Sequence, residues 1–507
     1  MNFTPLVRPF LINNAERTDL WPERGADVQL SQLRSLLKRA RHTDYGECNN
    51  FDDILKRDDI YTSFRDTVPL IEYEDIRAEV LRMVNGERNV LWPGRCLNYA
   101  QSSGTSGGRS KFIPVTADNL RSCHYRGALD CTSHYLRSNP ESRILSGKAF
   151  ILGGSFASRL HTVDRRVKIG DLSATLISHI NPLANFFRVP DMRTALMADW
   201  EEKLPALVEA AKFENITNIS GVPSWFLTVI KEVIKARGVE KISDAWPNLE
   251  VFFHGGISFE PYRDIYRSLT DASKMHFVET YNASEGFFAV QNDPSDNSML
   301  LILDNDIFYE FRDISRPDKA PVPMWEAEPG KVYELIISSS NGLWRYRLGD
   351  TVRVTSTCPF KIKIAGRTKT FINAFGEELM EDNAERAVAE ASRATGAAVH
   401  NYTAAPVFAT DSKRGCHQWL FEWLTPPTDA EAFAAELDKT LRRLNSDYDA
   451  KRSHTIFLDP PQVTTVPPGT FDRWLTTVGS GKRGGQRKIP RLSNNRDIVD
   501  AILKFLA

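Results

Sequence analysis

Hydrophobic positions along the first part of the chain alternate between two periods, one typical of helices and one of buried strands. Residues 27–41 place apolar side chains near helical spacing, which predicts an amphipathic helix: Val28, Leu30, Leu33, Leu36 and Leu37. Residues 224–238 repeat the pattern, with Gly238 placed to end the helix. Short apolar runs near Ile151, Phe252 and Val278 are typical of buried strands. This alternation predicts a layered α/β architecture with a mainly parallel sheet.

The pattern changes twice farther along the chain. After Asp306 the segments IFYEFRDI, KVYELIIS, WRYRLGDTVRV and KIKIAG predict a β-rich region with Gly, Asn, Ser and Pro between the strands. After GRTKTFINAFGEEL, two predicted helices alternate with two predicted strands, which indicates a smaller α+β domain. We therefore expect a large N-terminal domain over residues 1–366 and a smaller C-terminal domain over residues 367–507.

Composition excludes several classes of protein. A chain of 507 residues corresponds to about three domains of ordinary size. Its 64 Lys and Arg residues balance 65 Asp and Glu residues, so no general attraction to nucleic acid or to an anionic membrane is expected. The six cysteines contain no CxxC pair, and no apolar run or N-terminal segment is typical of a membrane span or secretory signal. We expect a cytoplasmic protein with reduced thiols, and we expect a monomer.

The segment QSSGTSGGRSK, residues 101–111, is the first candidate for chemistry. Its glycines allow backbone N–H groups to close around an anion, its hydroxyls add donors, and Lys111 adds a cation. It is not a Walker A loop, because Gly108 is followed by Arg109 and not by Lys. By composition alone, it can equally be a flexible surface loop.

The order of residues in this loop resembles the phosphate loop of the adenylate-forming superfamily, which contains acyl-CoA synthetases, nonribosomal adenylation domains and luciferase. TYNASEG, YRLGD and GRTKTFINAFGEEL follow in the order of that superfamily's landmarks. Within it, the chain most resembles the Gretchen Hagen family of acyl acid amido synthetases. The segments behind that narrower resemblance are SSGTSGG, GVPSWF, WRYRLGDTVRV, GTFD and QRKIPR.

The resemblance implies an ATP site. Ser102, Ser103 and Thr105 are expected to bind the β- and γ-phosphates, with Lys111 nearby. Glu285 is expected to hold Mg²⁺, because this hard cation takes carboxylate and phosphate oxygens together. Three further roles follow for the nucleotide: Tyr281 stacks on adenine, Thr280 or Ser284 reaches the α-phosphate, and Gly255 with Gly256 lets backbone approach the purine. His254 is better interpreted as a packed core histidine than as a base.

Two later segments complete the expected nucleotide site. Asp350 is expected to accept from the ribose hydroxyls, although LGDT also suits a simple turn, and Arg367 is expected to face the nucleotide. Lys488 is the best match to the superfamily's late catalytic lysine, with three competitors in the same basic stretch: Lys482, Arg487 and Arg491. Asn373 stands where the superfamily's hinge segment often carries Lys, so no role is expected there.

The acid-binding residues are the least readable part of the sequence. Candidates on the helix after the phosphate loop are Arg121 and Tyr125, and candidates in GVPSWF are Ser224, Trp225 and Phe226. Val229 and Phe287 are further candidates for the pocket walls, and an aromatic stripe at helical spacing is also typical of plain core.

The resemblance implies that the protein adenylates a carboxylic acid with ATP and Mg²⁺, and then transfers the acyl group to the amine of an amino acid. Two alternatives remain: an acyl-CoA synthetase, in which a thiol attacks, and a nucleotide-binding protein without catalysis. A zinc hydrolase is unsupported because HExxH is absent. GxSxG occurs at residues 104–108, but no apolar strand leads into it as a nucleophile elbow requires.

Overall fold

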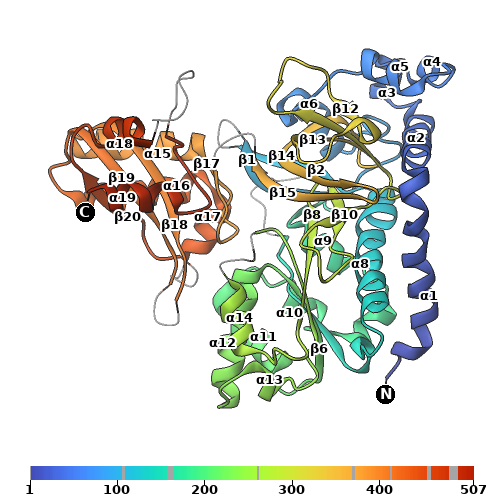
Figure 1. The fold of residues 1–507 in the computed structure, drawn as a ribbon, viewed down its shortest axis with the longest axis horizontal. Helices are drawn as coiled ribbons and strands as arrows, with labels where there is room; N and C mark the ends of the chain where they lie inside the picture. The colour runs from blue at the N-terminus through green and yellow to red at the C-terminus, as the bar shows by residue number, and fades with distance from the viewer. Residues whose placement is uncertain are drawn as a thin grey trace. The chain divides into compact units, whose positions relative to one another are not determined.

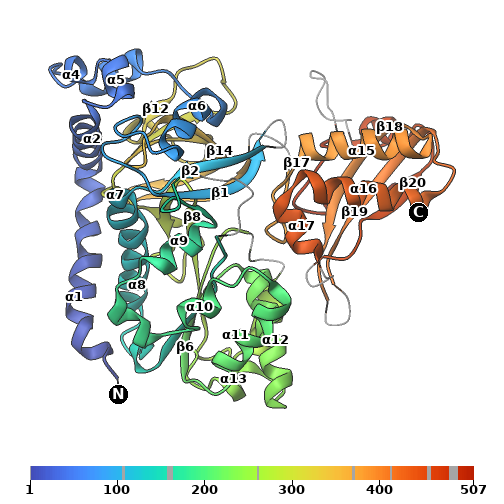
Figure 2. The same ribbon diagram turned by 180° about the vertical axis from the view of Figure 1, so that it is seen from behind.

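The computed structural model describes residues 2–105, 109–156, 164–257, 259, 262–367, 371–410, 414–453, 458–478 and 489–506. Within these ranges, the side chains at positions 102–105, 109, 110, 183, 367, 382, 472 and 476–478 are not described. The chain divides into two compact units. The large unit comprises Met1–Ser102 and Lys111–Thr368, and the small unit contains Lys369–Ala507. Figure 1 and Figure 2 show the two units from opposite sides.

One continuous sheet of twelve strands organises the large unit, in the order β12-β11-β13-β14-β15-β10-β9-β8-β7-β6-β3-β5. The strands at one end pair in parallel: β3 (Lys148–Ile151), β5 (Arg188–Val189), β6 (Ile216–Gly221), β7 (Val251–His254) and β8 (His276–Ala283). Three of these strands occupy the predicted positions near Ile151, Phe252 and Val278. The predicted parallel sheet is therefore confirmed.

The remaining strands of this sheet pair in antiparallel fashion: β9 (Gly286–Val290), β10 (Met299–Leu301), β11 (Ile307–Asp313), β12 (Val322–Pro323), β13 (Val332–Ser339), β14 (Leu343–Thr357) and β15 (Phe360–Arg367). The β-rich region after Asp306 is confirmed, but the change of direction comes earlier, between β8 and β9. Both halves belong to one sheet because β8 pairs with β7 on one side and with β9 on the other. A separate small sheet has the order β2-β1-β4, from Arg109–Pro114, Asn98–Thr105 and Lys168–Gly170.

Helices cover both faces of the parallel half, as buried strands require. Phe252 and Phe253 are successive residues of β7, so their side chains point to opposite faces. Phe252 packs on Phe226 of α12 (Pro223–Arg237), and Phe253 packs on Tyr135 of α8 (Tyr125–Ser138). Further helices of this half are α9 (Leu172–Ser178), α10 (Met192–Ala195), α11 (Trp200–Ala211), α13 (Ile242–Ala245) and α14 (Arg263–Leu269).

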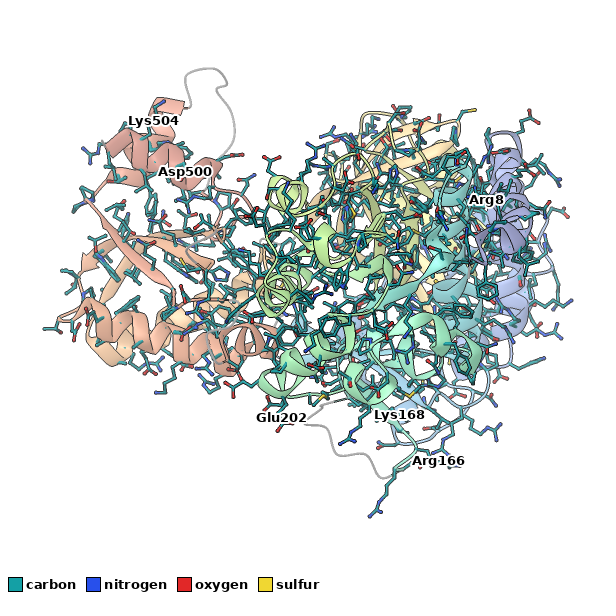
Figure 3. All side chains as sticks on the ribbon, turned by 90° about the horizontal axis from the view of Figure 1, so that it is seen from below. Arg8, Arg166, Lys168, Glu202, Asp500 and Lys504 are labelled. Atoms are coloured by element: carbon teal, nitrogen blue, oxygen red, sulfur yellow. The ribbon has the colours of Figure 1, made fainter. Side chains whose placement is uncertain are left out.

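The N-terminal helices α1 (Thr4–Glu16) and α2 (Trp21–Ala40) form the long column seen at one edge of the large unit in Figure 1. The helix predicted over residues 27–41 is confirmed as the second half of α2. Arg8, labelled in Figure 3, fastens α1 to the end of α8 by donating to the carbonyls of Leu136 at 2.8 Å and Ser142 at 3.1 Å. The short helices that complete the unit are α3 (Asp44–Cys48), α4 (Phe51–Ile54), α5 (Ile60–Thr67), α6 (Tyr73–Val84) and α7 (Ala117–Asn119).

The small unit is a three-stranded sheet between two layers of helices. Its strands β18 (Ala398–Val407), β19 (Cys416–Thr425) and β20 (Gln462–Val466) lie in the order β18-β19-β20. Trp419 and Phe421 face the core shared with α15 (Glu381–Thr395) and α16 (Ala430–Leu444), whereas Leu420 faces α18 (Thr470–Val478) and α19 (Asp497–Leu506). The remaining elements are α17 (Ser446–Arg452) and the pair β16 (Phe371–Ile372) and β17 (Leu379–Met380).

The predicted fold class, a large α/β and β-rich domain followed by a smaller α+β domain, is confirmed. The predicted basic stretch after GTFDRWL lies largely outside the described residues. Among the helices that the structure describes, none combines the length and apolar character needed to cross a bilayer. All six cysteines are described, and each is a free thiol.

Candidate active site

The candidate site is built where the parallel half of the large sheet ends. In sheets of this type, ligands bind beyond the carboxyl ends of the parallel strands, where the strand order or direction switches. Here β8 is the last parallel strand, and the turn that follows it carries Ser284 and Glu285. The predicted nucleotide segment TYNASEG therefore lies at the switch between the two halves.

Tyr281 of β8 and Asp350 of β14 form the central contact of this site. The tyrosine hydroxyl donates a hydrogen bond of 2.6 Å to Oδ2 of Asp350, and the two residues are only 5% and 8% exposed. Tyr281 also packs edge-on against Phe288 at a ring separation of 4.8 Å. The Phe288 ring and the Asp350 carboxylate thus fix the position of the Tyr281 ring, the first by packing and the second through the hydroxyl.

Lys111 and Tyr346 form a second contact between distant motifs. Lys111 is the last residue of the predicted phosphate loop and lies on β2, and its Nζ atom is 3.3 Å from the Tyr346 hydroxyl. The ammonium also lies 5.8 Å from the centre of the Tyr346 ring, within the range of a cation–π interaction. Tyr346 precedes Asp350 by four residues on β14, so the loop and the YRLGD segment meet.

The segment HGG ends β7 beside Thr280. The Thr280 hydroxyl donates to the carbonyl of His254 at 3.1 Å. A Cβ atom on Gly255 would lie 2.4 Å from the Thr280 carbonyl oxygen, so only glycine lets β7 and β8 approach this closely. Gly256 has a φ of +84°, and a Cβ atom there would meet Val222 at an ordinary contact distance of 3.6 Å. The backbone here is therefore able to lie close to a ligand.

His254 itself belongs to the core. Its ring stacks on Phe259 at 4.1 Å, and burial lowers its pKa to about 3, so it stays neutral at physiological pH. This agrees with its interpretation as a packed histidine and not as a base.

Glu285 is largely buried at the β8–β9 turn, beside the half-exposed Ser284. Its backbone carbonyl accepts a hydrogen bond of 3.0 Å from the side chain of Asn341, which fixes the turn against the end of β13. One carboxylate suits Mg²⁺ that arrives with phosphate oxygens, since this ion takes one or two protein carboxylates there. No cluster of three His, Cys, Asp or Glu side chains suited to an all-protein metal site occurs in the described part of the chain.

Several predicted site residues lie outside what the structure describes. Backbone is described for Ser102, Ser103, Thr105 and Arg367, and side chains are not; Lys488 lies outside altogether, as do its competitors Lys482 and Arg487. Arg367 pairs with Asp350 between β15 and β14. Arg491 is held inside the small unit, 3.2 Å from Glu385, 4.6 Å from the Tyr402 ring, and hydrogen-bonded to Asn401.

The candidate acid-binding residues are dispersed. Arg121 is exposed over 78% of its side chain and pairs with Asp118 at 3.0 Å. The Tyr125 hydroxyl donates to the carbonyl of Leu176 at 2.8 Å, and burial raises its pKa to about 12.

The residues of GVPSWF face different surroundings. Phe226 is fully buried between Phe150 and Phe252. Val229 on the same helix is also fully buried, and Phe287 on β9 is 6% exposed in a separate core cluster. No face of the Phe226 ring remains for a substrate, because the interior of the helix layer surrounds it. Ser224 is largely buried, and Trp225 is half-exposed beside Trp200, at a ring separation of 5.1 Å. Trp225 is therefore the aromatic residue of this segment whose side chain is partly exposed.

Family models for three consecutive domains match this chain in order. The GH3 family N-terminal domain matches residues 16–275, the central domain matches residues 300–367, and the C-terminal domain matches residues 382–497. The chain belongs to the GH3 family. The resemblance inferred from its motifs is thereby confirmed.

Relatives of this GH3 protein match over nearly their whole length. The indole-3-acetic acid-amido synthetase GH3.8 of Oryza sativa subsp. indica is 25% identical, over 94% of this chain and 89% of the relative. Among solved structures, an acyl acid amido synthetase, AtGH3.15 in complex with 2,4-DB, aligns with a TM-score of 0.60 and 20% identity, covering 98% and 96% of the two chains. A 2-hydroxyisobutyryl-CoA ligase with its acyl-AMP and CoA aligns with a TM-score of 0.57 and 13% identity, covering 96% and 92%. These structures share the fold of this chain.

Residues that support the site were missed by motif reasoning. Asn341, which holds the Glu285 turn, lies 56 residues away from it. His124 is buried and contacts the Asn282 side chain through Nδ1 at 3.2 Å, next to Tyr281. Neither residue stands in a motif, so spacing offered no signal for them.

Proposed function

We propose that this GH3 protein is an ATP-dependent acyl acid amido synthetase. In the first step a carboxylate oxygen attacks the α-phosphorus of ATP, giving an acyl-adenylate and pyrophosphate. In the second step the amine of an amino acid attacks the acyl carbon, giving an amide, AMP and a proton. The observation that carries the proposal is the buried contact of Tyr281 with Asp350, which joins the two nucleotide motifs at the end of β8.

Asp350 is proposed to bind the ribose. A carboxylate has about four lone-pair sites on its two oxygens, so Asp350 can accept from Tyr281 and from a ribose hydroxyl at the same time. The bond from Tyr281 also fixes the direction of the carboxylate. With its hydroxyl engaged in this way, Tyr281 offers adenine the face of its ring and not its tip. Arg367, the strand partner of Asp350, is proposed to face the same nucleotide.

The phosphates are proposed to lie between the loop and the end of β8. Ser102, Ser103, Thr105 and Lys111 bind the β- and γ-phosphates, and Thr280 or Ser284 reaches the α-phosphate. Glu285 holds Mg²⁺, which when bound neutralises phosphate charge as pyrophosphate leaves. Gly255 and Gly256 bring backbone close to the purine. The chemistry needs little beyond positioning and charge neutralisation.

The acid and the small domain form the second part of the proposal. Trp225 and Ser224 at the start of α12 are proposed to line the acid pocket, with Tyr125 and Arg121 as more distant candidates.

Lys488 is proposed to approach the α-phosphate and the acid oxygen as the domain of residues 367–507 closes on the domain of residues 1–366. We further propose that the protein acts as a cytoplasmic monomer on small-molecule substrates.

Pyrophosphate release tests this function. The protein is incubated with ATP, Mg²⁺ and each member of a panel of carboxylic acids, with and without each amino acid, and the products are identified by mass spectrometry. We expect acid-dependent pyrophosphate, and amide with one AMP per amide when the matching amine is present. Thioester formation with added coenzyme A in place of amide would favour an acyl-CoA synthetase. Absence of acid-dependent pyrophosphate across the panel would contradict adenylation.

A further inference from the structure

Arg345 has an unusual backbone conformation beside the proposed nucleotide site. It lies on β14 directly before Tyr346, and its φ of +44° places it in the left-handed region. Long L side chains avoid this region, and residues held there gather at functional sites. Something in the surrounding structure must therefore hold Arg345 in place.

The guanidinium of Arg345 donates four hydrogen bonds in the interior. It donates to both carboxylate oxygens of Glu310 at 2.9 Å each, and to the carbonyls of Arg65 at 2.7 Å and Val68 at 2.8 Å. Arg345 is 4% exposed and Glu310 is 1% exposed. The backbone N–H of Arg345 also donates to the Ser338 hydroxyl at 2.8 Å. The residue thus joins β11, β13, β14 and the end of α5.

These contacts surround an irregularity in the pairing of β13 with β14. The register shifts between Ile337 and Ser339, opposite the part of β14 that contains Arg345. Ile71 bridges Tyr346 from outside the sheet, donating to the Arg345 carbonyl at 3.2 Å and accepting from the Arg347 N–H at 2.8 Å. The face of the sheet to which the Tyr346 side chain points depends on this bend, because a slip of one residue in the pairing would turn the side chain to the opposite face.

We propose that the Arg345–Glu310 pair is a positioning device for nucleotide binding. It holds the left-handed bend in β14, and the bend directs Tyr346 toward Lys111 and sets the register that brings Asp350 to Tyr281. The inference rests on the proposed function, since it assumes that Tyr346 and Asp350 serve the nucleotide. A buried ion pair is often no more stabilising than an apolar pair of the same volume, so stability alone does not account for this one.

The test separates positioning from stability. Arg345→Met and Glu310→Leu are made singly and together, and each variant is assayed for its urea unfolding midpoint and for ATP dissociation by calorimetry without acid. Arg345→Met leaves the Glu310 carboxylate buried without its cation, and Glu310→Leu leaves the Arg345 guanidinium buried without its anion. Each single variant should therefore unfold at a lower urea concentration than the parent. The double variant should regain only the part of the midpoint that the unpaired charge cost, because the carbonyls of Arg65 and Val68 still lose their donor. It should still bind ATP about tenfold more weakly than the parent. A double variant that binds ATP like the parent overturns the inference.

A matched pair in the small unit provides the control. Arg452 donates to both oxygens of Asp438 at 2.7 Å each and to the carbonyl of Leu458, and both residues are largely buried. Arg452→Met with Asp438→Leu should change the unfolding midpoint in the same way and leave the ATP dissociation constant within about twofold of the parent. If both double variants bind ATP equally more weakly than the parent, the Arg345–Glu310 pair affects ATP binding only through overall stability, and the inference is overturned.

Two further variants keep the test decisive when the double variant does not fold. Glu310→Gln keeps the shape of the side chain and one acceptor, and Arg345→Lys keeps the charge without the fork that bonds both oxygens. Raised ATP dissociation constants in folded forms of these variants support the inference, and parent-like constants overturn it. A parent that binds ATP but releases no pyrophosphate with any acid would contradict the proposed function and leave this test intact.

Discussion

The hydroxyl of Tyr281 lies 2.6 Å from Oδ2 of Asp350, although β9, β10 and β15 separate their strands in the sheet. Neighbouring strands are about 4.8 Å apart, so four such spacings exceed the reach of two side chains across a flat sheet. The antiparallel half must therefore curl strongly, as twisted sheets do. The curl joins two nucleotide motifs that lie 69 residues apart in sequence.

Removing either partner of this contact should weaken ATP binding. Asp350→Ala takes a charged acceptor from the ribose, and Tyr281→Phe removes the hydrogen bond that orients this acceptor. Hydrogen bonds to charged groups contribute about 1.5–3 kcal/mol, so we expect the ATP dissociation constant to rise roughly tenfold or more in each variant. Calorimetry on folded protein measures the effect.

Tyr402→Phe is the matched control for this experiment. Tyr402 is buried in the small unit, and its hydroxyl lies 3.5 Å from the carboxylate of Glu385. Its loss should leave ATP binding unchanged. If Asp350→Ala also binds ATP like the parent, the carboxylate of Asp350 serves only the pairing of β14 with its neighbours and the ribose assignment is wrong.

The large unit should lose stability in mild acid because three of its histidines are buried and neutral. Burial lowers the pKa of His254 to about 3 and the pKa values of His124 and His134 to about 4. The unfolded chain binds a proton at each of them near pH 6.5, so stability is complete above that pH and falls as the pH drops toward the folded values. At pH 5 the loss is about 2 kcal/mol for each histidine.

Urea unfolding at pH 7 and pH 5 checks this prediction. His254→Phe replaces a ring that stacks on Phe259 and should reduce the difference between the two pH values. An unchanged difference in this variant would show that His254 does not contribute to the acid sensitivity.

Lys488→Ala should depress acid-dependent pyrophosphate exchange. The substitution removes a cation from the place where charge develops at the α-phosphate, and loss of one such group typically costs 10²- to 10³-fold in rate. Arg491→Ala serves as the comparison, since Arg491 is engaged with Glu385 and Tyr402 within the small unit. Full exchange activity in Lys488→Ala would assign the cation to Lys482 or Arg487.

Lys369→Pro should separate the two half-reactions. The resemblance to the adenylate-forming superfamily implies a hinge at Lys369, about which we propose that the small domain rotates after the adenylate forms. Proline fixes φ near −65° and should restrict that rotation. We expect pyrophosphate exchange to be spared more than amide formation. Both rates are measured on each variant, with folding checked by circular dichroism. Equal loss of both rates would contradict a hinge at this position.

The sequence by itself determined the elements and the family of this protein. Apolar spacing is a local property, so it correctly predicted α12 with its Gly238 cap and the buried strands around Phe252 and Val278. Ordered motifs were sufficient for the family, because each motif is a short segment whose residues are adjacent.

Only the tertiary structure decided which residues meet. Spacing places Phe226 on the apolar stripe of α12, but it does not say how far the adjacent Trp225 is covered, since the neighbouring helices determine that. Likewise, Arg345 reads in sequence as one more polar residue of a strand, and its partner Glu310 lies 35 residues earlier. The physical reason is that periodicity sets the face on which a side chain lies, whereas the pairing and curl of twelve strands set what lies opposite it.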